Sequence, residues 1–159
     1  MMDFIARLFG HGEPALSEAR PRDAAAIAKL HGAAFHRGWS DGEIESMLID
    51  RRVVAHRATL GRTMAGFILS RCAADEAEIL SVAVVPARRG KGLARRLLDL
   101  HLRRLAGLGT RAVFLEVEEG NVPARRLYAR FGFREVGRRE GYYREGAKSA
   151  AALVLRRDF

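Results

Sequence analysis

Several features that would point to a secreted, membrane-bound or metal-binding protein are scarce in this sequence. The one cysteine, Cys72, cannot form an intramolecular disulfide, which fits a reducing cytoplasm. The five histidines show no metal-ligand spacing and one cysteine cannot complete the usual zinc sets, so we expect no metal. No apolar run approaches the ~20 residues that cross a bilayer. The first residues lack the long apolar core and the cleavage site of a secretory signal.

The composition favours a globular domain with an anionic partner. Of 159 residues, 48% are hydrophobic and 30% are charged, which is typical of one soluble domain. Acidic residues are outnumbered, because 19 Asp and Glu stand against 28 Lys and Arg, a formal net charge of +9. A nucleotide cofactor, nucleic acid, a ribosome or an acidic peptide would each suit this charge, and the charge does not choose among them.

The hydrophobic pattern predicts one α/β domain over residues 16–159, with a mixed, mostly antiparallel central sheet flanked by helices. The expected order is β-α-α-β-β-β-α-β-α-β-β. Strands are expected at 16–20, 53–59, 63–73, 77–85, 112–117, 134–142 and 150–156, and helices at 21–35, 41–49, 90–108 and 123–131. The fourth and fifth strands should be parallel neighbours, since a helix joins them. Residues 1–15 form a lead that is either a docking helix or a frayed terminus.

A capping box opens the second predicted helix. The Ser40 hydroxyl can accept from the Glu43 N–H, and the Glu43 side chain can reach back. Trp39, the only tryptophan, precedes the cap and is placed for a hydrophobic staple with Ile44. Trp39 could equally line a substrate entrance, and the sequence leaves both roles open.

The stretch from Val82 to Leu98 carries the strongest functional signal. An apolar, β-branched run passes through Pro86 into the turn Arg89-Gly90-Lys91-Gly92 and then into a Leu- and Arg-rich helix. Glycines let the main chain approach a ligand, and the N–H groups of such a turn and of the helix N-terminus favour an anion. The turn therefore predicts a phosphate site, and the alternative is a solvated basic connection.

Two further side chains could take part in proton transfer. Glu116 interrupts an apolar strand, so its carboxylate should face water, a cleft or a partner, and a cleft would suit a general base. Tyr128 lies on the helix at 123–131. A tyrosine, with an ordinary pKa near 10, would need a local shift or a hydrogen-bonding role to assist a departing thiolate of pKa about 8.5. The alternatives are an outward-facing glutamate and a core tyrosine.

These residues together carry a resemblance to a family. The turn Arg89-Gly90-Lys91-Gly92-Leu93-Ala94 resembles the pyrophosphate-binding motif of the GNAT acetyltransferases, Q/R-x-x-G-x-G/A. Asn121, Leu127-Tyr128 and Phe131-Gly132-Phe133 resemble the second conserved block of that family, and the likeness runs from about Leu16 to Phe159. Within the family the chain most resembles the bacterial RimI-type ribosomal-protein-alanine N-acetyltransferases. That likeness rests on Trp39-Ser40, Asp75-Glu76-Ala77, Val82-Ala83-Val84, Leu115-Glu116-Val117, Asn121, Leu127-Tyr128 and Tyr142-Tyr143.

The resemblance implies a role for each matching residue. Main-chain groups of Val82, Ala83 and Val84 would hold the acetyl-pantetheine arm of acetyl-CoA. The pyrophosphate would lie against Arg89, Gly90, Lys91, Gly92, Leu93, Ala94 and Arg95, and Asn121 would also contact the cofactor. Glu116 would be the general base, through water, and Tyr128 the general acid. Trp39, Tyr142 and Tyr143 would line the peptide entrance.

The implied activity is cytoplasmic acetyl transfer from acetyl-CoA to the N-terminal alanine of ribosomal protein S18, with no metal, no membrane and no required nucleic acid. Two departures leave the acceptor open. The RimI type usually has proline after the double tyrosine and an acidic pair before the last strand, where this chain has Arg144 and Ser149-Ala150. A lysine side chain or a small amine is therefore the alternative acceptor. A non-catalytic acyl-CoA-sensing or RNA-associated module is the alternative from another class, and it would not need Glu116 and Tyr128. The sequence does not indicate an oligomeric state.

Overall fold

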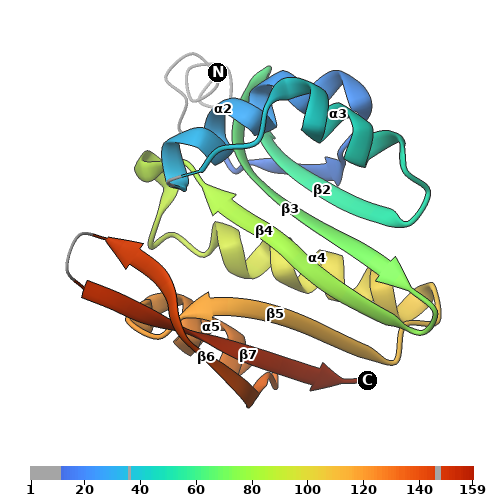
Figure 1. Ribbon diagram of the computed structural model, residues 1–159. Helices are drawn as coiled ribbons and strands as arrows, with labels where there is room; N and C mark the ends of the chain where they lie inside the picture. Colours follow the sequence, from blue (N-terminus) through green and yellow to red (C-terminus); the bar gives the residue numbers. More distant parts are fainter. Residues whose placement is uncertain (1–11, 36, 146–147) are drawn as a thin grey trace. The chain divides into compact units, whose positions relative to one another are not determined.

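The computed structural model describes residues 12–35, 37–145 and 148–159, and Figure 1 follows their path. The strands are β1 (Ala15–Glu18), β2 (Val53–Leu60), β3 (Thr63–Ala73), β4 (Glu76–Val84), β5 (Ala112–Glu118), β6 (Arg134–Glu145) and β7 (Lys148–Asp158). The helices are η1 (Pro21–Asp23, 3-10), α2 (Ala24–Ala34), α3 (Asp41–Ile49), η2 (Pro86–Arg88, 3-10), α4 (Leu93–Gly107) and α5 (Val122–Arg130). The predicted order of strands and α-helices is confirmed. Most of the predicted lead, residues 1–11, lies outside the described residues.

The sheet is mixed, as the sequence predicts. Its hydrogen-bonded order is β1-β2-β3-β4-β5-β7-β6. The pairs β1–β2, β5–β7 and β6–β7 are antiparallel. The pair β4–β5 is parallel, with a register that runs from Glu76 opposite Ala112 to Ile79 opposite Leu115. Parallel neighbours cannot be joined by a tight turn, so α4 makes the connection between β4 and β5.

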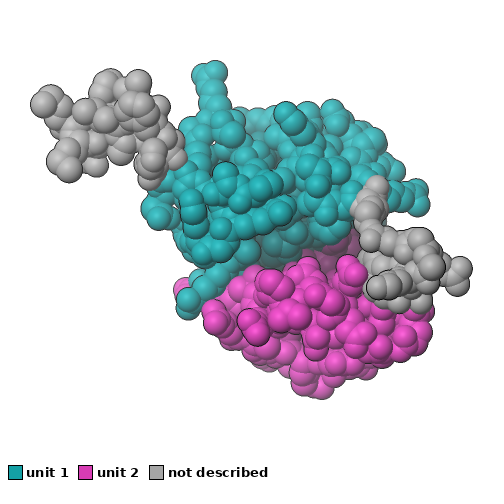
Figure 2. Space-filling view, turned by 90° about the vertical axis from the view of Figure 1, so that its left-hand side faces the viewer, with its two compact units in different colours: residues 1–69, 81–101 teal, residues 70–80, 102–159 magenta. Residues whose placement is uncertain are grey.

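The chain forms two compact units, which Figure 2 shows in teal and magenta. Unit 1 consists of residues 1–69 and 81–101, and unit 2 of residues 70–80 and 102–159. Three elements, β3, β4 and α4, contribute residues to both units. The boundary between the units therefore falls within regular secondary structure, where the sequence shows no linker composition.

The core of unit 1 combines β3 with helix residues. Fully buried apolar side chains come from α2, α3, β3 and the first turns of α4: Ile27, Ile44, Phe67, Ile68, Leu69, Leu97 and Leu98. Each such side chain contributes about 1.5–3 kcal/mol when removed from water. Helices α2 and α3 also pack against each other.

Gly66 allows a close approach inside unit 1. A Cβ at this position would lie 3.0 Å from the carbonyl oxygen of Ala83 and 3.1 Å from a methyl group of Leu97. Those contacts are tighter than most Cβ contacts in proteins, so a side chain here would push its neighbours apart, and glycine favours the close approach of β3 to β4 and α4. The Val85 N–H donates to the Ala65 carbonyl at 2.9 Å beside this position.

Two polar pairs lie in the interior of unit 1. His56 of β2 and His101 of α4 approach through their Nδ1 atoms at 2.8 Å, so one neutral ring donates and the other accepts. Burial, and then the neighbouring His56, lowers the pKa of His101 to about 3. In the second pair, the Arg57 guanidinium lies 2.5 Å from the buried Asp23 carboxylate, and Asp23 also accepts from the Arg20 N–H at 2.8 Å. This contact ties η1 to β2.

The core of unit 2 lies on one face of β5 and β7. Leucine and valine side chains alternate toward this face along both strands, and the buried ones are Val113, Leu115, Val117, Leu153 and Leu155. Helix α5 covers this face, because α5 and both leucines of β7 line the same pocket. Helix α5 then ends as predicted. Gly132 adopts a φ of +82°, and the Phe133 N–H donates to the Tyr128 carbonyl at 3.1 Å.

The predicted capping box is confirmed at the start of α3. The Glu43 N–H donates to the Ser40 hydroxyl at 3.1 Å, and the Ser40 N–H donates to the Glu43 carboxylate at 2.8 Å. Helix α3 begins at Asp41 and ends at Ile49, as the sequence predicts. Local hydrogen bonds thus set the point at which the chain enters α3.

Candidate functional site

The strand–turn–helix segment of unit 1 has the backbone geometry of an anion cradle. Strand β4 ends at Val84, η2 follows, and the chain then passes through Gly90 and Gly92 with φ values of +72° and +80°. These conformations strain any residue except glycine. No atom beyond the chain neighbours lies within 4 Å of where a Cβ would stand at either glycine, so the space beside this backbone is open.

The first turn of α4 follows this glycine turn directly and begins with N–H groups that have no partner within the helix. The first bond of the helix runs from the Arg96 N–H to the Gly92 carbonyl at 3.1 Å, so the N–H groups of Leu93, Ala94 and Arg95 have no partner within the helix. Lys91 and Arg95 are exposed and add formal positive charge. Helix dipole, N–H groups and cations therefore all favour an anion here.

The neighbouring basic side chains make contacts of their own. Arg89 donates from Nε to the Val84 carbonyl at 3.2 Å, which folds the turn back onto the end of β4. Arg96 forms an ion pair with Glu13 at 3.0 Å and donates to the Pro14 carbonyl at 3.1 Å. Arg96 therefore holds the chain just before β1 against the first turn of α4.

Strand β4 extends past its ladder with β5. The parallel register includes residues 76–79 of β4, and the strand continues for five more residues to Val84. Val82 is half-buried, and Ala83 and Val84 are buried, so their side chains pack inside unit 1. Main-chain groups of this segment are the part that a bound ligand could use, and the role that the resemblance implies for them, holding the acetyl-pantetheine arm, stays a prediction.

Glu116 in unit 2 has a partner that the sequence did not reveal. Strand alternation puts its side chain on the face opposite Leu115 and Val117, and it is 21% exposed. Arg139 of β6 reaches its Oε1 at 3.1 Å. In the register of the sheet, Glu116 lies opposite Val154 of β7, and Arg139 lies opposite Ala152, two residues earlier in that strand. The ion pair therefore crosses β7 diagonally.

Tyr128 is a buried phenol on α5. Its side chain is 9% exposed, and its ring packs edge-to-face against Phe133 with centroids 5.7 Å apart. Burial raises the pKa of Tyr128 to about 12. The phenol therefore keeps its proton at neutral and moderately alkaline pH, and it can act as a hydrogen-bond donor.

Asn121 begins α5. Its side-chain oxygen accepts from the Ala124 N–H at 3.2 Å, which is the bond of an N-cap residue. The amide NH2 group is the other end of this exposed side chain, and it is a donor. The structure thus gives Asn121 a role in the helix and leaves a donor suited to a ligand oxygen.

Of the three residues predicted to line a peptide entrance, the structure describes the side chain of one. Trp39, in unit 1, is half-buried, and its ring stacks on His31 of α2 with centroids 4.1 Å apart. Tyr142 and Tyr143 belong to β6, where Tyr143 pairs with Ala150, and their side chains lie outside the described part of the structure. The sequence interpretation missed His31, which lies in the last turn of α2, four residues before Phe35.

The predicted site residues divide between the units. Unit 1 contains Trp39, residues 82–84 and the turn with Arg89 to Arg95, whereas unit 2 contains Glu116, Asn121 and Tyr128. Within unit 2, Asn121 and Tyr128 lie on the helix that covers one sheet face, and Glu116 points to the other face. A proton acceptor and a hydrogen-bond donor therefore belong to opposite faces of the same part of the sheet.

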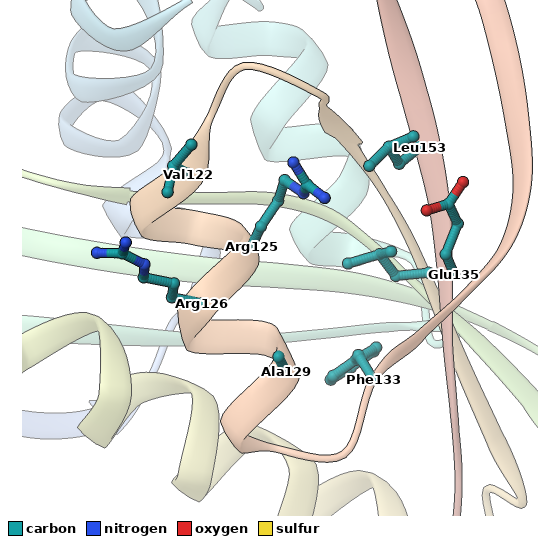
Figure 3. Close-up of a pocket in the computed structure, with 8 residues that line it drawn as sticks. Val122, Arg125, Arg126, Ala129, Phe133, Glu135 and Leu153 are labelled. Carbon is teal, nitrogen blue, oxygen red and sulfur yellow. The ribbon is translucent and has the colours of Figure 1, made fainter.

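A pocket of about 370 Å³ lies between α5 and the strands β6 and β7 of unit 2, and Figure 3 shows its lining. Phe133 and Leu153 form apolar walls, with Glu135 of β6 beside them. Arg125 donates to the Glu119 carbonyl at 3.0 Å, and Arg126 points away from the strands. None of the predicted site residues lines this pocket, so it is separate from the face of Glu116.

Among the described residues, the His, Cys, Asp and Glu side chains form no group of three or more that could hold a metal ion. The helices within this described part include none with the length and apolar character needed to cross a bilayer.

Known proteins share both sequence and structure with this chain. The sequence model of the acetyltransferase (GNAT) family matches residues 24–133. A ribosomal protein bS18-alanine N-acetyltransferase of Escherichia coli strain K12 is 29% identical over 142 residues, which cover 88% of this chain and 95% of that protein. The protein of the same name from Haemophilus influenzae is 37% identical over 78 residues, covering 49% of this chain and 53% of that protein.

Two solved structures illustrate the likeness of the fold. The ribosomal-protein-S18-alanine N-acetyltransferase from Escherichia coli matches with a TM-score of 0.83 at 27% identity, over 90% of this chain and 92% of that chain. Arabidopsis thaliana NAA60 in complex with acetyl-CoA matches with a TM-score of 0.79 at 20% identity, over 91% of this chain and 98% of that chain.

Proposed function

The chain belongs to the GNAT family of acetyltransferases, and from this premise we propose that its acceptor is the N-terminal alanine of ribosomal protein S18. Membership makes it an acyltransferase that uses acetyl-CoA. The observation that supports the acceptor is the relative from Escherichia coli, which is named for this reaction and is matched over 95% of its length. A ribosomal acceptor implies a cytoplasmic enzyme, and the net charge of +9 suits a partner within the ribosome.

The residues of unit 1 fit the cofactor. The open backbone at Gly90 and Gly92 and the N–H groups of Leu93, Ala94 and Arg95 suit the pyrophosphate. Arg89 and Lys91 add charge beside it. The NH2 group of Asn121, in unit 2, is a further donor that the family resemblance assigns to the cofactor. Main-chain groups of Val82, Ala83 and Val84 would pair with the acetyl-pantetheine arm, because strand edges recognise extended amide-containing chains.

When bound, acetyl-CoA supplies a thioester that accepts an amine. Glu116 takes up the proton that the acceptor amine must lose, through water, since an N-terminal amine of pKa about 8 is largely protonated at neutral pH. An N–H group at the end of β4 would be suited to hold the carbonyl oxygen of the thioester. Tyr128, which keeps its phenol proton, would donate a hydrogen bond to the sulfur.

Arg139 adds a constraint on the proposed base. Its ion pair at 3.1 Å holds the Glu116 carboxylate in one orientation before the acceptor arrives. Arg139 is 58% exposed, so water screens the pair and its energy is small, on the order of 1 kcal/mol or less. A positively charged acceptor amine can therefore compete with Arg139 for the carboxylate.

The acceptor is tested with defined amines. Purified enzyme and labelled acetyl-CoA are incubated with a peptide of the S18 N-terminus beginning in alanine, with the same peptide blocked at its N-terminus and carrying an internal lysine, and with polyamines. Label should enter the free N-terminal peptide at a kcat/KM at least tenfold above the others. Activity confined to lysine or to polyamines would overturn the proposal and leave the family assignment intact.

Cofactor binding is tested at Gly92. Gly92→Val forces a β-branched residue into a φ of +80° and should raise the KM for acetyl-CoA at least tenfold. Gly61→Val is the matched control, because Gly61 has a φ of +59° and equally open surroundings, but it lies in the β2–β3 turn. Equal KM values for the two variants would show that the glycine turn does not hold the cofactor.

A further inference from the structure

His31, in the last turn of α2, lies between the aromatic rings of Phe35 and Trp39, which follow this helix in the chain. Its centroid is 4.5 Å from that of Phe35 at an interplanar angle of 26°, and 4.1 Å from that of Trp39 at 11°. Two rings stacked this closely cannot share one face of a single imidazole. Phe35 and Trp39 therefore occupy opposite faces, and His31 is the middle layer of a three-ring stack.

A hydrogen bond fixes the protonation state of the middle ring. The backbone N–H of Trp39 donates to Nδ1 of His31 at 3.2 Å. An accepting Nδ1 requires the neutral ring, with its proton on Nε2. His31 is 4% exposed, and this burial lowers its pKa below 6.5, which favours the same neutral form.

The stack is anchored on both sides. His31 belongs to the last turn of α2, where its carbonyl accepts from the Phe35 N–H at 3.0 Å, and its ring also contacts Phe67 of β3 with centroids 6.5 Å apart. On the other side of Trp39, Ser40 is held in the capping box of α3. Trp39 is therefore held by His31 through both its ring and its backbone, and by Ser40 through the chain.

We propose that His31 is a positioning residue for the acceptor peptide, acting through Trp39. This inference rests on the proposed function and on the role that the family resemblance implies for Trp39, as part of the peptide entrance. His31 does not touch the acceptor. It sets the position of the indole and of the Trp39 backbone. The Trp39 side of the entrance is therefore ordered before the peptide arrives, and peptide binding does not have to order it.

Two substitutions separate the two contacts. His31→Phe keeps a ring for the stack and removes the hydrogen-bond acceptor Nδ1. His31→Asn keeps a hydrogen-bond acceptor near the position of Nδ1 and removes the ring. Each should raise the KM for the peptide about fivefold, as expected for the loss of one hydrogen bond or one stacking contact. The kcat and the KM for acetyl-CoA should stay within twofold of wild type. A fall in kcat with an unchanged peptide KM would overturn the proposal.

The dependence on Trp39 is tested in a double-mutant cycle. Trp39→Ala should raise the peptide KM more than either variant of His31, and adding His31→Phe to it should change the KM no further. Independent, multiplicative effects would show that His31 does not act through Trp39, and would overturn the inference.

The contact itself is observable without any turnover, because Trp39 is the only tryptophan. A stacked imidazole quenches indole fluorescence when it becomes protonated. Wild-type emission should therefore fall on acidification, with a midpoint below pH 6.5, while circular dichroism shows the fold to be intact, and His31→Phe should abolish the transition. The same transition in His31→Phe would overturn the inference. Wild-type enzyme that acetylates no peptide but keeps this transition would overturn the proposed function instead.

Discussion

Tyr128→Phe tests what a buried phenol can contribute to acetyl transfer. The substitution removes one oxygen and keeps the ring that packs against Phe133 with centroids 5.7 Å apart. We therefore expect the variant to fold, with a midpoint of thermal unfolding within a few degrees of wild type. The change in rate then reports the hydroxyl alone.

The magnitude follows from the pKa. The pKa of Tyr128 is about 12, and a CoA-like thiol has a pKa of about 8.5, so full proton transfer to the thiolate is uphill by about 3.5 units, or roughly 5 kcal/mol. Donation of a hydrogen bond to the charged sulfur avoids this cost and contributes about 1.5–3 kcal/mol. Tyr128→Phe should thus lower kcat by a factor of roughly 10–150 and leave the KM for acetyl-CoA unchanged.

The assay is the release of the CoA thiol at saturating substrates from pH 7 to pH 10. A group with a pKa raised to about 12 keeps its proton over this whole range, so the ratio of wild-type to variant kcat should be constant. A ratio that collapses toward one between pH 8 and pH 10 would show that the phenol ionises there. That result would refute the effect of burial, whereas a ratio of one at every pH would refute the hydrogen-bonding role.

Other substitutions test the base, the close approach in unit 1 and the buried histidines. Glu116→Gln should bind acetyl-CoA with unchanged affinity by calorimetry but lose most turnover at neutral pH, and unchanged turnover would remove Glu116 from the mechanism. Gly66→Ala should lower the free energy of unfolding by about 1–3 kcal/mol in urea titrations, because its Cβ would lie 3.0 Å from the Ala83 oxygen. Since the pKa of His101 falls to about 3 on folding, the unfolded state binds its proton first. Stability should therefore be complete above pH 6.5 and decrease by up to ~1.4 kcal/mol per unit as the pH falls toward 3, and His101→Leu should flatten this slope.

Local features of the fold were predictable because neighbouring residues encode them. The Ser40–Glu43 capping box and the Asp41–Ile49 helix follow from side-chain chemistry three residues apart, and both are confirmed. Gly132 ends α5 because its left-handed conformation stops a helix. Small differences occur where competing local geometries are close in energy: the predicted helix from Pro21 begins as the 3-10 turn η1, and a second 3-10 turn, η2, separates β4 from the glycine turn.

Contacts between distant residues were not predictable from one sequence. The ion pair of Glu116 with Arg139 depends on the register of β5, β7 and β6, which no local pattern of charges specifies. The position of the Trp39 side chain depends on contacts with His31 of the preceding helix, α2. The sequence left a staple and a substrate entrance open for Trp39, and the structure adds a stack on His31 that neither alternative included.

The sequence by itself determined the order of elements, the glycine turn and the family, because each depends on residue types at short, fixed spacings. Tertiary structure alone decided the electrostatic character of the candidate site. Packing makes Tyr128 a phenol with a pKa of about 12, gives Glu116 a cationic neighbour and keeps His31 neutral between two rings. The physical reason is that burial and long-range partners set the energy of a charge, and both exist only once distant segments have packed together.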